Sequence, residues 1–181
     1  LIENLTTGRT EVTIASIHGT QSTTINLLEL NNQAEGEYQL FAEARDGAGN
    51  RSEREHGFFL DKTAPLVSLA VPVENAVLAG NLSTPVRGSV SDDRLDSYTL
   101  AVAPQSVENW TELASGTSAL ADAEILSWRP NLSDGPYRLR LRASDLAGNT
   151  SEVIHAVIID NTPPLAEITQ RALEPRVRHG L

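Results

Sequence analysis

Four aspartates recur in two equivalent pairs, and their side chains are the ones in this sequence best suited to bind a ligand. Asp46 and Asp145 each begin a D-x-A-G-N stretch, and Asp61 and Asp160 each begin a D-x-T-x-P stretch. Their carboxylates are hard oxygen donors, and calcium takes about six to eight oxygens from carboxylates, carbonyls and waters. We therefore treat these four aspartates as candidate calcium ligands.

One cluster is suggested at the centre of the chain, where Asp61 would be joined by Asp92, Asp93 or Asp145. The competing interpretation is that each aspartate accepts hydrogen bonds from backbone NH groups ahead of it and caps its own turn without an ion. No dense D-x-D-x-D run occurs in the chain, and this favours the turn-cap interpretation.

Two tryptophans offer a different kind of site. Trp110 and Trp128 could form an aromatic platform for sugars, since each presents a large flat ring. Aromatic residues make up only 4% of the chain, however, and one tryptophan can bury about 150–250 Å². Trp128 also follows Leu126 in a strand-like alternation. We therefore expect both tryptophans to pack in a core, and an exposed one would indicate a ligand face.

The histidines do not indicate an active site. His56 and His155 occupy equivalent positions 99 residues apart, and the other two are His18 and His179. A repeated position favours a structural role over a single catalytic one. The chain contains no P-loop, no G-x-S-x-G and no H-E-x-x-H motif, and nothing in the sequence assembles a nucleophilic triad. We expect no enzymatic activity.

Composition narrows the class of partner. The net charge is -10 with a pI near 4.8, which argues against nucleic acid and anionic membrane surfaces, because both attract basic proteins. No apolar stretch approaches the roughly 18–20 residues of a membrane span, so we expect no direct membrane insertion. The chain has no cysteine, and neither disulfides nor thiolate-bound metals can hold the fold.

An internal repeat gives the domain organisation. Residues 36–69 align without a gap with residues 135–168, a shift of 99, and 15 of 34 positions are identical. A period near 100 is about the length of one immunoglobulin-like β-sandwich and is too long for a helical solenoid. The chain therefore contains a duplicated domain.

Within the repeat the patterns predict β-structure. Residues 137–143 alternate apolar and charged side chains, as a half-buried strand with outward arginines does. Residues 153–159 are rich in branched side chains, which predicts a more buried strand, and the D-L-A-G-N stretch between them predicts a hairpin turn. Pro65 and Pro164 should end the strand ladders at the unit boundaries. Further strands are predicted over residues 67–71, 85–90, 97–103, 110–114 and 125–128.

The full pattern from residue 134 onward is D-G-x-Y-x-L-x-L-x-A-x-D-x-A-G-N-x-S, followed by I-D-N-T-P-P. It resembles the bacterial immunoglobulin-like or fibronectin-III-like tandem repeats of large surface and secreted proteins. The resemblance implies an all-β fold of tandem immunoglobulin-like β-sandwich modules and an extracellular or cell-surface location. It also implies that calcium could rigidify the joints between modules, as it does in some such arrays.

The repeat register sets the expected boundaries. Residues 1–64 should form a partial immunoglobulin-like module that lacks its first strands, and residues 65–163 a complete one. Residues 164–181 should begin a third module or form a tail.

Two functions remain open. The first is a structural spacer or stalk of a bacterial cell-surface or secreted multidomain protein, adhesin-like or part of a surface filament. Its partners would be the neighbouring immunoglobulin-like modules of the same chain. The second is an accessory binding module, attached to a secreted enzyme, that recognises a polysaccharide or protein ligand. Burial of both tryptophans would favour the spacer.

Overall fold

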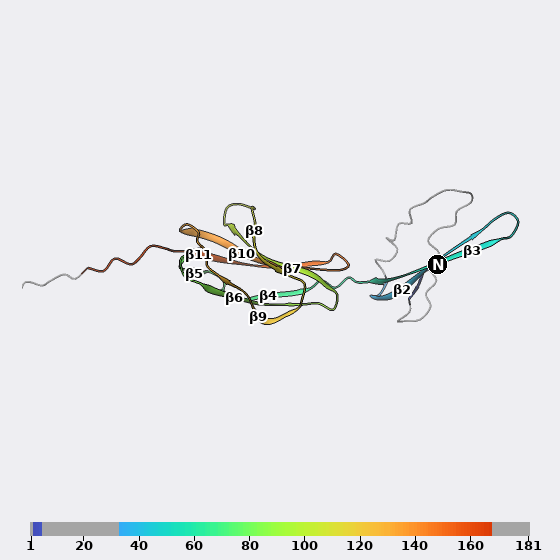
Figure 1. Ribbon diagram of the computed structural model, residues 1–181, viewed down its shortest axis with the longest axis horizontal. Coiled ribbons are helices and arrows are strands. Elements are labelled where there is room, and N and C mark those ends of the chain that lie inside the picture. The colour runs from blue at the N-terminus through green and yellow to red at the C-terminus, as the bar shows by residue number, and fades with distance from the viewer. Residues whose placement is uncertain (1, 5–32, 168–181) are drawn as a thin grey trace, which may run out of the picture.

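The structure is a computed structural model that describes residues 2–4 and 33–167, and every regular element in this part of the chain is a β-strand. A β-sandwich is joined through a short linker to a β-hairpin unit (Figure 1). The expected all-β immunoglobulin-like fold is confirmed. No helix among the described residues is long and apolar enough to cross a bilayer.

The hairpin unit is a three-stranded sheet in the order β1-β2-β3. Its strands are β1 (Ile2–Asn4), β2 (Gly36–Arg45) and β3 (Arg51–Leu60). The sandwich pairs a three-stranded sheet, β4-β6-β9, with a five-stranded sheet, β5-β11-β10-β7-β8. Its strands are β4 (Leu66–Val71), β5 (Ala76–Leu78), β6 (Thr84–Ser91), β7 (Leu95–Pro104), β8 (Thr111–Gly116), β9 (Leu120–Trp128), β10 (Gly135–Asp145) and β11 (Thr150–Ile159).

The sandwich core is mainly aliphatic and lies between the two sheets. On β10, Leu139, Leu141 and Ala143 are fully buried, and the arginines between them face outward, as the alternating pattern predicts. Burying one leucine side chain contributes about 1.5–3 kcal/mol. The core cluster comprises Leu69, Leu78, Val86, Val90, Leu100, Val102, Trp128, Leu139, Leu141, Ala143, Val157 and Ile159.

Strand β11 differs from its predicted environment. Its run of branched residues predicts a more buried strand, but only alternate side chains such as Val157 and Ile159 are buried, whereas Ile154 and Ile158 are 38% and 43% exposed. The reason is that the five-stranded sheet packs against its partner on one face, so the other face of β11 meets solvent, as antiparallel sheets commonly do.

The predicted strands of the sandwich are present with bounds shifted by a few residues, and one strand was missed. Strand β5 pairs in parallel with β11 through only three residues. It follows Asn75, whose φ of 62° turns the chain. Three residues are too few to produce an alternation that sequence analysis can detect.

The hairpin unit repeats the geometry of the sandwich. Gly36 pairs with Leu60 at the base of β2–β3, just as Gly135 pairs with Ile159 at the base of β10–β11. Strand β1 lies beside β2 antiparallel, and β7 lies beside β10 in the same way. The predicted remainder of the first module, residues 5–32, and most of the predicted third module, residues 168–181, lie outside the described residues.

Gly88 provides a test of how closely the central strand of the small sheet, β6, approaches the edge strand β4. A Cβ at this buried β6 position would lie 2.3 Å from the Ser68 carbonyl oxygen of β4, and backbone cannot yield cheaply. Gly88→Ala should therefore destabilise the sandwich by about 1–3 kcal/mol or more, measured by thermal unfolding. Gly57→Ala is the control on strand β3, because its nearest contact would be at 3.9 Å. Equal melting of the two variants would contradict this packing.

Candidate functional site

The turn between β10 and β11 is held by the Asp145 carboxylate. Its Oδ1 accepts hydrogen bonds from the backbone NH of Ala147 at 2.9 Å and of Asn149 at 2.8 Å. Its Oδ2 accepts one from the Asn149 side-chain amide at 2.8 Å. These contacts close the five-residue D-L-A-G-N turn, so the aspartate acts as the turn cap that one interpretation of the sequence expects.

The equivalent turn of the hairpin unit has the same contacts. Asp46 accepts hydrogen bonds from the NH groups of Ala48 and Asn50 at 3.0 and 2.8 Å, and from the Asn50 side chain. The environments nevertheless differ, because the Asp46 turn is exposed whereas Asp145 is only 3% exposed. Burial of Asp145 therefore comes from what surrounds its turn and not from the turn itself.

The linker and the β6–β7 loop cover Asp145. The Asn149 side-chain amide donates to the backbone carbonyl of Asp61 in the linker at 3.2 Å. The NH of Leu146 donates to the carbonyl of Arg94 in the β6–β7 loop at 2.9 Å. The sandwich thus contacts the linker through the Asn149–Asp61 hydrogen bond, at the end nearest the hairpin unit (Figure 1).

The pKa of Asp145 reflects two opposing effects. Burial, the largest single effect, raises it, because the charged form is poorly solvated. The hydrogen bonds from the side chain and backbone of Asn149 and from the NH groups of Ala147 and Gly148 lower it, and together they prevail. The carboxylate is consequently held in its charged form with a pKa below the ordinary value of 3.8.

The linker is also fastened to the hairpin unit. Glu35, just before β2, accepts hydrogen bonds from the NH of Lys62 at 2.7 Å and from the Thr63 hydroxyl at 2.8 Å. The NH of Thr63 donates to Asp61 Oδ1 at 3.1 Å. We call this set of contacts the exit clasp, since it holds the chain where it leaves β3.

The same exit clasp follows β11, shifted by 99 residues. Asp134 accepts hydrogen bonds from the NH of Asn161 at 2.9 Å and from the Thr162 hydroxyl at 2.8 Å. The NH of Thr162 donates to Asp160 Oδ1 at 2.9 Å. The D-x-T stretch is therefore one structural device used at both exits, and Asp160 caps its own turn there.

Three carboxylates meet where the linker joins the sandwich. Asp61 from the linker, Asp92 from the β6–β7 loop and Asp145 from the β10–β11 turn each place one oxygen within 4.8 Å of the others. Their like charges repel at this distance, and a divalent cation would relieve the repulsion. Oxygen donors are what calcium prefers, so these residues could hold such an ion.

The structure thus gathers part of the predicted ligand set. Asp61 and Asp145 come together with Asp92, one of the two alternatives weighed for the β6–β7 loop. Asp93 does not join the group that the described residues form. Asp46 caps the β2–β3 turn, and Asp160 caps the turn that follows β11. Neither aspartate is part of this cluster.

A cleft of about 690 Å³ lies between the hairpin unit and the sandwich. Arg94 spans it, with its guanidinium carbon 3.5 Å from the centre of the Phe59 ring on β3. The contact is a cation–π interaction across the joint. The cleft is lined by Glu35, Phe59, Asp61, Thr63, Ala64, Leu66, Ser91, Asp92, Asp93 and Arg94.

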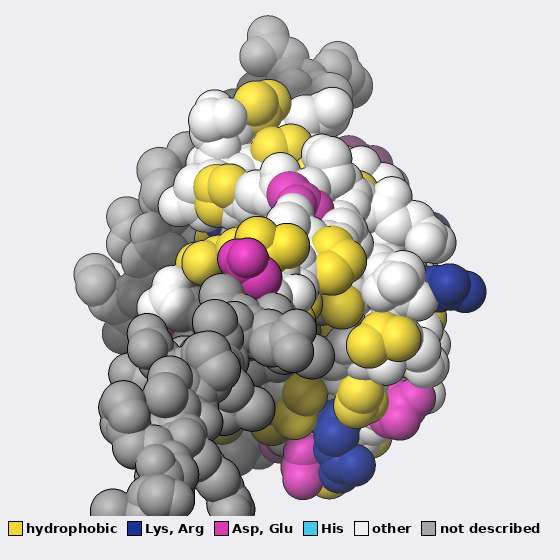
Figure 2. All heavy atoms as spheres, turned by 90° about the vertical axis from the view of Figure 1, so that its left-hand side faces the viewer, with side chains coloured by type: hydrophobic (Ala, Val, Ile, Leu, Met, Phe, Trp, Pro, Cys, Tyr) yellow, Lys and Arg dark blue, Asp and Glu magenta, His cyan; other side chains and the backbone are white. Residues whose placement is uncertain are grey.

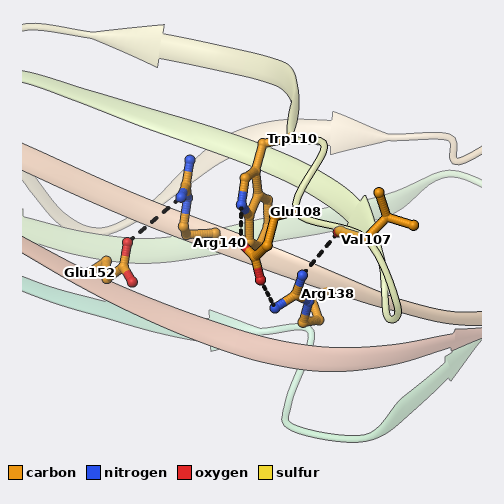
Figure 3. Close-up of polar contacts among 6 residues, drawn as sticks. All are labelled: Val107, Glu108, Trp110, Arg138, Arg140 and Glu152. Carbon is orange, nitrogen blue, oxygen red and sulfur yellow. Dashed lines mark hydrogen bonds and ion pairs between the residues drawn. The ribbon is translucent and has the colours of Figure 1, made fainter.

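The two tryptophans lie in different environments. Trp128 is 4% exposed and packs in the sandwich core, as predicted. The core placement predicted for Trp110 is wrong. This residue is partly buried and lies outside the core, in the loop before β8, where it stacks on the outer face of β10 (Figure 3).

Arginines and a glutamate position Trp110. The guanidinium carbon of Arg140 lies 4.1 Å from its ring centre and that of Arg138 lies 5.1 Å away. Glu108 accepts hydrogen bonds from the Trp110 indole NH at 3.2 Å and from Arg138 at 2.8 Å, and these bonds lower the pKa of Glu108, that from Arg138 most. The sequence pattern predicted that the arginines of β10 face outward. It gave no indication that Trp110 would stack against them.

The equivalent histidines do not share one environment. His155 Nδ1 lies 2.8 Å from the carbonyl oxygen of Pro72, a contact that ties β11 to the β4–β5 loop. His56 is exposed on β3, while His18 and His179 lie outside the described residues. The structural role expected for the repeated position is therefore seen for His155 alone.

Comparison with known proteins agrees with this geometry. Residues 103–161 match the family of bacterial Ig-like domains. Over this segment the sandwich is similar to bacterial Ig-like domains. The matched segment runs from the end of β7 past β11, so it contains Trp110, the β10 arginines and the Asp145 turn.

Fibronectin(III)-like modules of Clostridium thermocellum CbhA are a similar solved structure. They share 19% sequence identity with this chain, cover 76% of it and 70% of their own chain, and have a TM-score of 0.49. No curated protein matches the chain.

The Asp145 turn should give the sandwich a pH-dependent stability. Because its pKa is lowered on folding, the stabilisation is present above pH 3.8 and is lost as the pH falls through the folded-state pKa. Asp145→Asn should lower the melting temperature at pH 7, since an amide cannot accept from both Asn149 donors. As the pH is lowered below about 4, the melting temperature of the Asp145→Asn variant should fall less than that of the wild type. Parallel melting curves of the two proteins against pH would contradict this assignment.

Proposed function

We propose that this chain is a structural spacer of a bacterial cell-surface or secreted multidomain protein. The observation that carries the proposal is the joint, where hydrogen bonds fasten the linker to both units and a cation–π contact joins β3 to the β6–β7 loop. A linker fastened on both sides restricts bending, which a stalk requires and a flexible tether does not.

The proposed architecture is a tandem array. Residues 1–64 are a partial Ig-like module, residues 65–163 a complete one, and residues 164–181 begin a third module or form a tail. The second exit clasp, at Asp134, supports the array, because it holds the chain after β11 in the same way as the first clasp holds the linker before the sandwich. The exposed Asp46 turn likewise matches the half of a joint that Asp145 provides.

The far end of the sandwich is suited to a following module. Viewed from that end, hydrophobic side chains gather on its visible part, with few charged groups among them (Figure 2). Val73 and Leu82 are each 63% exposed, and they flank β5 in the loops that follow β4 and precede β6. An exposed apolar surface of this kind favours association with another protein surface.

The proposed role of the carboxylate cluster is to bind calcium and stiffen the joint. Asp61, Asp92 and Asp145 come from three separate segments, so one ion would join the linker, the β6–β7 loop and the β10–β11 turn. Backbone carbonyls and waters would complete its coordination. This proposal adds to the turn-capping role of each aspartate, since one carboxylate can accept hydrogen bonds and bind an ion.

The proposed location is extracellular, and the chain is proposed to have no enzymatic activity of its own. The similarity of residues 103–161 to bacterial Ig-like domains, which are commonly extracellular, supports this location. The proposed partners are neighbouring Ig-like modules. A second function, as an accessory binding module, is favoured by the partly buried Trp110 on the outer sheet.

A distance measurement tests the stiff joint. The chain has no cysteine, so spin labels can be attached at Ser52→Cys on β3 and Ala121→Cys on β9. Electron–electron distance measurements should give one narrow distribution in calcium. The pair Ser106→Cys and Ala121→Cys, within the sandwich, supplies the reference width. A distribution across the joint that remains far broader than this reference would reject the spacer.

Thermal unfolding tests the ion. Millimolar calcium should raise the melting temperature relative to excess chelator, by about 4–8 °C for each kcal/mol of binding free energy. Asp61→Asn and Asp92→Asn should abolish the rise, because each keeps an oxygen for its turn but removes a charge. Asp93→Asn is the matched control in the same loop and should retain it. No calcium effect in the wild type would leave the aspartates as turn caps only.

A further inference from the structure

The outer face of the five-stranded sheet concentrates positive charge on an acidic protein. Arg138, Arg140 and Arg142 occupy alternate positions along β10 and face away from the core. The whole chain has only 14 basic residues and a net charge of -10. A cationic stripe on such a background favours an anionic ligand at this place.

The three arginines differ in how far their donors are used. Arg138 is committed to the loop before β8, with hydrogen bonds to Glu108 at 2.8 Å and to the Val107 carbonyl at 3.0 Å (Figure 3). Arg140 stacks on Trp110 and reaches Glu152 only at 3.8 Å, which is beyond hydrogen-bond distance. Most of its guanidinium donors therefore remain available.

Arg142 has a still more open environment. Glu152 lies directly across from it in the β10–β11 register but forms its ion pair with Arg140 instead. Within residues 33–167, no hydrogen bond or ion pair engages the Arg142 guanidinium, which is exposed. Arg140 and Arg142 thus present neighbouring planar cations, each able to receive a carboxylate bidentately.

These two arginines line a shallow hollow of about 330 Å³ over β7, β10 and β11. Hydroxyl groups complete much of its wall, and they can both donate and accept hydrogen bonds. Asp96 engages two of them, Ser97 at 3.0 Å and Ser144 at 3.4 Å, whereas Thr99 and Thr150 are not engaged by it. The hollow is lined by Ser97, Tyr98, Thr99, Arg140, Arg142, Ala143, Ser144 and Thr150.

The position of the hollow selects the kind of ligand. It lies over β10 near the middle of the sheet, where the backbone groups pair with β7 and β11. An extended peptide could not add itself as a strand here, because that mode needs a free sheet edge. Recognition must use side chains alone: guanidinium groups for carboxylates and hydroxyls for hydroxyls.

We propose that this hollow binds the carboxylate groups of an acidic polysaccharide, built from uronic acids. Such a polymer offers carboxylates to Arg140 and Arg142 and hydroxyls to the threonines of the hollow. Asp96 and Glu152 at the rim disfavour a densely charged chain and favour one whose charges are spaced by sugar rings. This binding role goes beyond the spacer and does not depend on the calcium joint.

The test is binding of polygalacturonate to the full chain, measured by calorimetry in chelator and at several salt concentrations. Binding should weaken as salt rises, because charge pairs are screened. Arg142→Gln should weaken it at least about tenfold, the loss expected for a charge-assisted hydrogen-bonded pair. Arg140→Gln should do the same, and Arg129→Gln, an exposed arginine outside the hollow, should bind as the wild type does.

Folding and specificity controls decide between outcomes. Arg142 is exposed and its guanidinium forms no hydrogen bond or ion pair with the described residues, so its variant should melt as the wild type does, and a loss of binding then reports on the site. Neutral dextran should not bind. The proposal is overturned if polygalacturonate does not bind, if Arg129→Gln loses affinity as strongly as Arg142→Gln, or if poly-glutamate binds as well as the polyuronate, which would indicate an acidic peptide ligand.

Discussion

The burial of alternate side chains on β10 is the constraint on which the rest of the structure depends. Leu139 and Leu141 face the core with no exposure, which fixes the sheet position and register of this strand. A shift by one residue would exchange these leucines for arginines in the core. The same alternation places Arg138 and Arg140 outside, where they support Trp110, and it ends at Asp145, which it delivers to the joint. Core, outer face and joint are therefore coupled through one strand.

The joint illustrates how a repeated motif acquires different environments. Asp46 and Asp145 make the same hydrogen bonds within their turns, yet only Asp145 is buried, because a linker and a loop close over it. The exit clasp recurs as well, with Glu35 in one unit replaced by Asp134 in the other. Local chemistry is thus conserved between the two units, while the charge cluster arises from the contact of one unit with the other.

Local patterns in the sequence were sufficient for the strands and turns. Alternation predicted the two faces of β10, and D-x-A-G-N predicted the capped turn, since both depend on neighbours within a few residues. These local patterns did not predict features that depend on residues far apart in the chain. Strand β5 pairs with one strand, the distant β11, among the described strands. Trp110 was expected in the core, but its loop folds across the sheet to place the indole over Arg140 and its NH on Glu108.

The sequence by itself determined the all-β class, the repeat of 99 residues and the identity of the turn-capping aspartates, because periodicity and short-range hydrogen bonds are encoded locally. Only the tertiary structure decided which aspartates approach one another. It brought Asp61, Asp92 and Asp145 within 4.8 Å, and it left Asp93 out of that group. It also created the arginine-lined hollow on the outer sheet. The physical reason is that such sites form where segments far apart in the chain pack together, and spacing along the chain carries no measure of that distance.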